Sequence, residues 1–149
     1  MKRRTFLTGS MAAGVAAAAA GAGLLAPRAV LAAYPKNQFS AKSVDDALGG
    51  SFEHSDDIKI KAPDIAENGA VVPVRVTTGI AGASAISILA AENGTPMTSK
   101  FVLGEGAVGS VSTRIKMGKT SDIIAVVEAG GKMYANKKEV KVTIGGCGG

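Results

Sequence analysis

The only cysteine of this 149-residue chain stands two residues before its end. Glycines flank it on both sides, so the chain closes with Gly145, Gly146, Cys147, Gly148 and Gly149. Glycine has no side chain to pack and loses the most conformational entropy when ordered, which favours a flexible arm over a core segment. Five extended residues span roughly 17 Å, and a flexible glycine chain of that length averages roughly 12 Å. We expect residues 145–149 to present a thiol inside another protein's active-site channel.

The chemistry open to Cys147 is that of a nucleophile. A free thiol has a pKa near ~8.5, so a few per cent is thiolate at neutral pH. Lys137, Lys138 and Lys141 precede the arm and could favour the thiolate, whereas the terminal carboxylate of Gly149 opposes it. Without strong activation, the pattern favours a carrier thiol that a separate enzyme activates. The alternative is a frayed tail with an incidental cysteine, which the flanking glycines disfavour because they keep other side chains out of a narrow channel.

The chain lacks the residues that other kinds of catalytic or metal site would need. One His and one Cys are too few for a structural zinc site, and a catalytic triad would have to recruit His54 from the far end of the chain. The glycines lack the strand-to-helix context of phosphate-binding loops. For the acidic residues near His54, capping and solvation are favoured over metal binding. These residues are Asp45, Asp46, Glu53, Asp56 and Asp57. We predict no metal, no cofactor and no enzymatic turnover by the chain alone.

Residues 1–33 have the composition of an export signal. Arg3 and Arg4 are followed by a weakly apolar Ala/Gly-rich run, the pattern of twin-arginine export to the periplasm. Cleavage could fall after Ala32 or Ala33. The alternative is a retained membrane anchor, but the apolar run of about eighteen residues lies at the lower edge for spanning a bilayer. Twin-arginine export carries folded proteins, which indicates assembly with a partner or cofactor beforehand.

The basic character of the chain comes mostly from this signal. The whole chain has 17 Lys and Arg against 12 Asp and Glu, and its first 32 residues hold four basic and no acidic residues. Thirteen basic residues then face 12 acidic ones in the remainder. With no Trp and no basic stripe, nucleic-acid binding is disfavoured. An unpaired cysteine in an exported protein is a reactive thiol or an intermolecular disulfide, so a dimer through Cys147 is possible.

Beyond a loose opening at 34–38, one helix and several strands are predicted. Ser43 is a good N-cap, acidic residues follow it, and Gly49 and Gly50 end the helix. Alternating β-branched residues then predict strands, with Pro73 indicating an edge position or a bulge. The strands are expected at 58–62, 70–78, 85–91, 98–103, 109–117, 122–129, 132–135 and 139–144. We predict an all-β, immunoglobulin-like β-sandwich with a short N-terminal helix over residues 34–144, followed by the arm.

The C-terminal segment 142–149, Val-Thr-Ile-Gly-Gly-Cys-Gly-Gly, resembles the signature of the SoxY family. SoxY is the sulfur-carrier subunit of the periplasmic sulfur-oxidation (Sox) system. The resemblance extends through Asn68–Val74, through Thr113–Met117 and to the twin-arginine signal, and so covers most of the chain.

The resemblance implies a covalent carrier of thiosulfate-derived sulfur on the Cys147 thiol. In that family a haem c enzyme couples thiosulfate to the cysteine, a manganese thiosulfohydrolase releases sulfate, and a sulfur dehydrogenase oxidises the remaining sulfane. It further implies a heterodimer with a SoxZ-like subunit and no membrane association after signal removal.

Two other classes of function are kept as alternatives. The first is an exported binding or structural module whose cysteine only forms an intermolecular disulfide, because a β-sandwich alone does not fix function. The second is a ubiquitin-like sulfur carrier that uses a terminal Gly-Gly carboxylate, against which both the signal and the cysteine argue.

Overall fold

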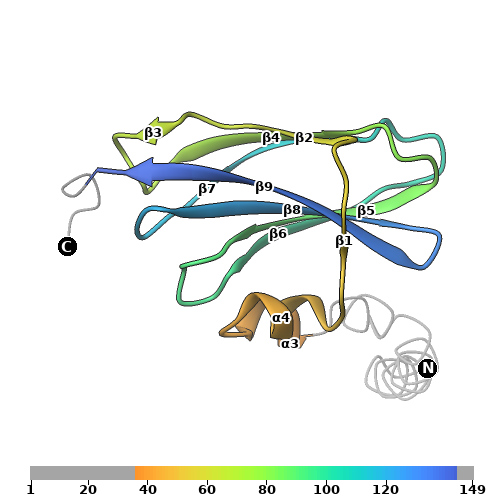
Figure 1. Ribbon diagram of the computed structural model, residues 1–149, viewed down its shortest axis with the longest axis horizontal. Coiled ribbons are helices and arrows are strands. Elements are labelled where there is room, and N and C mark those ends of the chain that lie inside the picture. Colours follow the sequence, from red (N-terminus) through yellow and green to blue (C-terminus); the bar gives the residue numbers. More distant parts are fainter. Residues whose placement is uncertain (1–35, 144–149) are drawn as a thin grey trace, which may run out of the picture. The chain divides into compact units, whose positions relative to one another are not determined.

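The computed structural model describes residues 36–143, and the predicted signal peptide and arm lie outside them. Two β-sheets lie face to face in this region, and two short helices cover one of them (Figure 1). The elements in chain order are α3 (Lys36–Ser40), α4 (Val44–Leu48), β1 (Glu53–His54), β2 (Ile58–Lys61), β3 (Ile65–Ala66), β4 (Val72–Thr78), β5 (Ala83–Ala90), β6 (Met97–Val102), β7 (Ser110–Ile115), β8 (Ser121–Ala129) and β9 (Lys132–Val142).

The larger sheet, here called sheet A, has the order β1-β9-β8-β5-β6, with β3 also pairing with β9. The smaller one, sheet B, has the order β2-β4-β7 and is antiparallel throughout. Both β1 and β3 run parallel to β9, one near its start and one at its end. Between them the chain leaves sheet A to form β2 in sheet B, so residues 53–66 join the two sheets.

The main core lies between the sheets. Val72, Val74 and Val76 of β4 face inward from sheet B and are almost fully buried, while the residues between them are exposed. This alternation is what a strand with one solvated face requires. From sheet A, Ile86 and Ile88 of β5 contribute to the same cluster and are fully buried.

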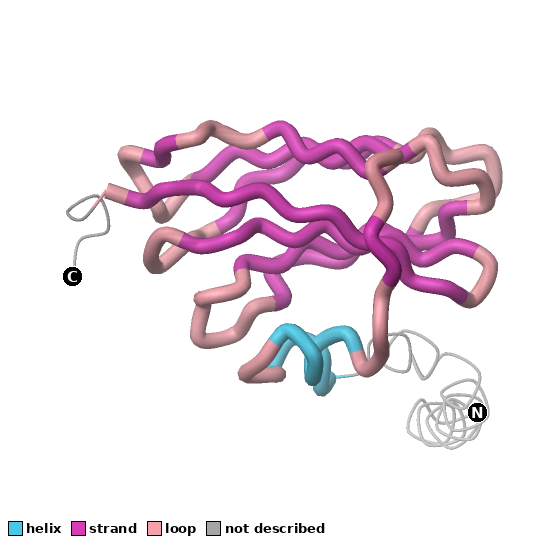
Figure 2. The backbone as a smooth tube through the Cα atoms, viewed as in Figure 1, coloured by secondary structure: helices cyan, strands magenta, loops and turns pink. Residues whose placement is uncertain are grey.

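A second, smaller core lies under the helices, on the face of sheet A that points away from sheet B (Figure 2). Ala47 and Leu48 of α4 pack there against Leu89 and Val126 of sheet A. Sheet A is therefore covered on both faces, and β5 is buried from Ala85 to Ala90. No helix within residues 36–143 is long and apolar enough to cross a membrane.

The helix predicted from Ser43 onward is confirmed as α4. The backbone N–H of Asp46 donates to the Ser43 hydroxyl at 3.1 Å, and Gly49 ends the helix with φ of 67°, where glycine is favoured. The all-β sandwich is also confirmed. The expected loose opening is wrong from Lys36 on, because α3 occupies Lys36–Ser40.

Two other expectations about the strands need correction. The strands predicted at 132–135 and 139–144 are one continuous strand, β9, which pairs with β8 along its length up to Val140. Pro73 does not place β4 at the edge, since β4 is the central strand of sheet B. However, pairing with β2 ends at Arg75, so Pro73 has a partner strand on only one side. A residue without an N–H is tolerated where no second neighbour needs that donor.

Candidate functional site

The sequence-predicted site residues lie outside the described part of the chain. These are Cys147, the arm glycines Gly145, Gly146, Gly148 and Gly149, and the signal residues Arg3 and Arg4. What the structure describes is the base from which the arm starts, up to Thr143. The geometry of this base decides how firmly the thiol-bearing segment is attached to the domain.

The last residues of β9 are held by hydrogen bonds from two sides. On one side β3 pairs in parallel, and the N–H groups of Lys141 and Thr143 donate to the carbonyl oxygens of Asp64 and Ala66 at 3.0 and 3.2 Å. On the other side the Val142 N–H donates to the Thr120 hydroxyl at 3.0 Å. The backbone is therefore paired residue by residue to the last described position.

Side-chain packing also reaches nearly to the end of β9. Val140 is fully buried in the main core, and Val142 packs against the same cluster while partly exposed. Lys141 between them is exposed, as the alternation predicts. The expected inward-facing series Val140 and Val142 is confirmed, and Ile144, the next residue in that series, lies outside the described residues.

The lysines expected to favour a thiolate are mostly engaged elsewhere. Lys137 pairs with Asp122 at 3.1 Å, and the Lys138 ammonium lies 2.9 Å from Asp64 and 2.8 Å from the Ala62 carbonyl oxygen. Lys141 alone of the three has no acidic partner within 4.0 Å among residues 36–143. Two of the three charges are thus already neutralised on the domain surface.

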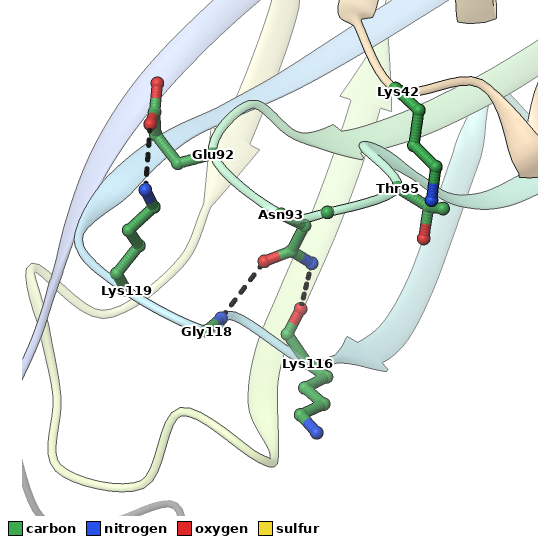
Figure 3. A pocket seen from close by; sticks show the side chains of 8 residues that line it. Lys42, Glu92, Asn93, Thr95, Lys116, Gly118 and Lys119 are labelled. Atoms are coloured by element: carbon green, nitrogen blue, oxygen red, sulfur yellow. Dashed lines mark hydrogen bonds and ion pairs between the residues drawn. The ribbon is translucent and has the colours of Figure 1, made fainter.

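A cationic hollow of about 530 Å³ lies between the β5–β6 turn and the β7–β8 loop (Figure 3). Asn93 joins the two loops: its amide donates to the Lys116 carbonyl oxygen at 2.7 Å and its oxygen accepts from the Gly118 N–H at 3.0 Å. Lys119 lies 3.4 Å from the Glu92 carboxylate. The hollow borders the arm base, because Thr120, which binds β9, directly follows Lys119. Its lining includes Lys42, Lys116 and Lys119.

The acidic residues around His54 are dispersed by the fold. Asp45 and Asp46 belong to the first turn of α4, while His54 lies in β1 and bonds through Nε2 to the Asp56 carboxylate at 3.1 Å. Both of those side chains are exposed. No group of three or more potential metal ligands is found within residues 36–143.

Sequence reasoning missed the part played by β3. Two residues carry no periodic pattern of their own, and the pairing with β9 spans more than seventy positions in the chain. The only local signal is that Ile65 and Ala66 stand between Pro63 and the Asn68-Gly69 turn, which bounds a short extended segment.

Fold and site together define a class: an all-β sandwich whose final strand is fixed to its last described residues and leads into a glycine-flanked cysteine. The family model for the sulfur oxidation protein SoxY matches residues 44–147, from the first residue of α4 to the cysteine. Among solved structures, the chain is similar to the sulfur carrier protein SoxY from Chlorobium limicola f thiosulfatophilum. Identity is 46%, the match covers 70% of this chain and 95% of that chain, and the TM-score is 0.63.

Because the family model spans more than half of the chain, the chain belongs to the SoxY family, whose role is in sulfur oxidation. The search among curated proteins gave no match.

Proposed function

We propose that this protein is a covalent sulfur carrier that holds thiosulfate-derived intermediates on the Cys147 thiol. The observation that supports this most is the pairing of β9 through Thr143. Three residues lie between that fixed point and the cysteine, and the four Cα-to-Cα steps from Thr143 to Cys147 span roughly 14 Å at most. The thiol can therefore enter a partner's channel while the sandwich stays outside it.

The loading step couples the thiol to thiosulfate. A bond forms between the Cys147 sulfur and the outer sulfur of thiosulfate, which gives a Cys-S-thiosulfonate. The thiol proton is released to solvent, and two electrons pass to a partner enzyme that carries haem c. The protein supplies only the thiol, so all redox chemistry belongs to the partner.

The unloading step releases sulfate. Water attacks the sulfonate sulfur of the bound thiosulfonate, the sulfur–sulfur bond to the sulfane atom breaks, and sulfate leaves with release of two protons. A persulfide stays on Cys147, with the electron pair of the broken bond on its terminal sulfur. A manganese thiosulfohydrolase is the proposed partner here, and a sulfur dehydrogenase is the partner for oxidation of the sulfane sulfur.

We also propose the domain limits and the cellular location. Residues 1–33 act as a twin-arginine signal, residues 34–144 form the carrier domain, and residues 145–149 form the presenting arm. The mature protein then works in the periplasm as a heterodimer with a SoxZ-like subunit. The positive charges of Lys42, Lys116 and Lys119 near the arm base suit an arm that bears an anionic sulfonate.

The test is intact-mass measurement of the protein from thiosulfate-grown cells, before and after treatment with a thiol reductant. We expect reducible adducts with the mass of a thiosulfonate or of one added sulfur, and none in the Cys147→Ser variant. Reconstituted thiosulfate oxidation should fall to background in Cys147→Ser and persist in a Ser99→Ala control. Circular dichroism should give the same melting curve for Cys147→Ser and the unaltered protein, since residue 147 lies beyond the last paired strand.

Two outcomes would contradict the proposal. One is full turnover with Cys147→Ser, and the other is a protein that never carries sulfur adducts under any growth condition. A disulfide-linked dimer as the sole Cys147-dependent species would instead favour the exported binding module, whose cysteine only joins two chains.

A further inference from the structure

The outward face of sheet B carries only positive charge. Each of its three strands alternates, with one set of side chains in the main core and the other set in solvent. None of the three contains an acidic residue. The solvent-facing set, here called the basic face, consists of Lys59, Lys61, Pro73, Arg75, Thr77, Ser110, Ser112 and Arg114.

The strand register brings like charges together on this face. Lys61 lies directly opposite Arg75, and Arg75 lies opposite Ser112. Like charges directly opposite in an antiparallel pair destabilise the sheet. Within residues 36–143, none of the four basic side chains of this face has an acidic partner within 4.0 Å. No ion pair among the described residues therefore offsets this repulsion.

The like-charged pair borders a hollow of about 310 Å³. The hollow lies where β2 ends at Lys61. The neighbouring strand β4 extends further, so its residues Val72 to Val74 have no partner in β2. Its lining also includes Ala62, Pro63, Pro73, Val74 and Ser112. Two cations, two flat apolar rings and a hydroxyl thus surround an indentation that another protein's side chain can enter.

The basic face differs from the charge balance of the chain as a whole. Residues 33–149 have nearly balanced charge, with 13 basic and 12 acidic side chains. Elsewhere several lysines are paired: Lys100 contacts Glu128, and in the hollow near the arm base Lys119 contacts Glu92. The basic face therefore gathers positive charges without acidic residues between them. The other cationic hollow differs, because Glu92 there pairs with Lys119.

We propose that the basic face of sheet B is a transient docking surface for an acidic patch on a partner protein. Three strands of four, seven and six residues cover at most roughly 20 Å by 15 Å, far less than the roughly 800 Å² per partner of a stable complex. Such a surface steers encounter and raises the association rate more than it holds a permanent subunit. The proposal does not require that Cys147 carries sulfur.

The other polyanions fit this face less well. Single-stranded nucleic acid is bound through aromatic platforms, and no aromatic residue occurs in β2, β4 or β7. A membrane surface is bound through inserted large apolar side chains, and among the eight strand residues of the basic face only Pro73 is apolar. An acidic protein surface needs only opposed charge, hydrogen-bonding hydroxyls and a shallow indentation, all of which are present.

The test is a titration of the reduced, ¹⁵N-labelled protein with a Glu-rich peptide, followed by amide chemical shifts. The decisive variant is Lys61→Gln with Arg75→Gln. Its matched control is Lys132→Gln with Lys137→Gln, which removes the same charge from the exposed surface of β9. We expect saturable shifts at the amides of β2, β4 and β7, and roughly tenfold weaker binding for the decisive variant only. Added salt should weaken binding by the unaltered protein.

Stability gives a second, independent measurement. Removal of the Lys61–Arg75 repulsion should leave the melting temperature of the decisive variant equal to or above that of the control. Absence of peptide shifts, or equal loss in both variants, would overturn the proposal. Tighter binding of heparin or of phosphatidylglycerol vesicles than of the peptide, through the same amides, would also overturn it in favour of a general polyanion or membrane site.

Discussion

The outer faces of the two sheets differ in cover and in charge. The outer face of sheet A lies under α4, and the Leu89 side chain on it is fully buried. Within residues 36–143 no helix covers the outer face of sheet B, and Arg75 at its centre is exposed. On sheet A the positive charge of Lys100 is compensated by Glu128, with Nζ 2.6 Å from the carboxylate oxygen. On sheet B the positively charged Lys61 lies opposite the positively charged Arg75. The comparison teaches that sheet A is covered and charge-compensated on its outer face, whereas the outer face of sheet B has neither feature among the described residues, which is why we propose it as a docking surface.

The largest expected effect comes from truncation on the two outer faces. Leu89→Ala should lower the free energy of unfolding by about 3 kcal/mol, because it leaves a cavity under α4. Arg75→Ala, at an outer position of sheet B, should change it by less than about 0.5 kcal/mol. Denaturant unfolding measures both. Equal losses would mean that the outer face of sheet A is not a second core.

The next effect concerns the lysines. Lys100→Met should cost about 1 to 2 kcal/mol, because the partly buried Glu128 carboxylate loses its only ion-pair partner within residues 36–143. Lys61→Met should leave the free energy of unfolding unchanged or raise it slightly, since it removes the repulsion between Lys61 and Arg75. Thermal melts of the two variants at low salt make the comparison. A larger loss for Lys61→Met would show that Lys61 has a stabilising partner.

The smallest effect concerns the arm base at the edge of sheet A. Thr120→Val removes the hydroxyl that accepts the Val142 N–H and should cost about 1 kcal/mol. Thr77→Val, on the outer face of sheet B, is the matched control and should be nearly neutral. Hydrogen exchange at the Val142 amide should speed up only in Thr120→Val. Unchanged exchange there would mean that β3 alone holds this end of β9.

Much of this fold could be predicted because its elements carry local signals. The alternation of Val72, Val74 and Val76 marks a strand with one solvated face, and Ser43 with Gly49 marks the helix ends. The parts that were missed depend on distant pairing. β1 and β3 exist only because β9 lies beside them, and β9 remains one strand because β8 pairs across Asn136, where the local pattern breaks.

The two candidate functional regions also differ in how far the sequence predicts them. Cys147 and its glycines could be singled out from composition alone, since one cysteine between glycines suits no core. The basic face could not, because Lys59, Lys61, Arg75 and Arg114 belong to three strands and form no stripe in the sequence. Only the register of sheet B brings them together.

The position of β9 between β8 and the parallel strands β1 and β3 has a mechanical consequence. A pull along the axis of β9 acts across its antiparallel hydrogen bonds to β8, which lie perpendicular to that axis. Such a pull loads many bonds at once in shear instead of opening them one after another. The attachment therefore resists tension best along the axis of β9.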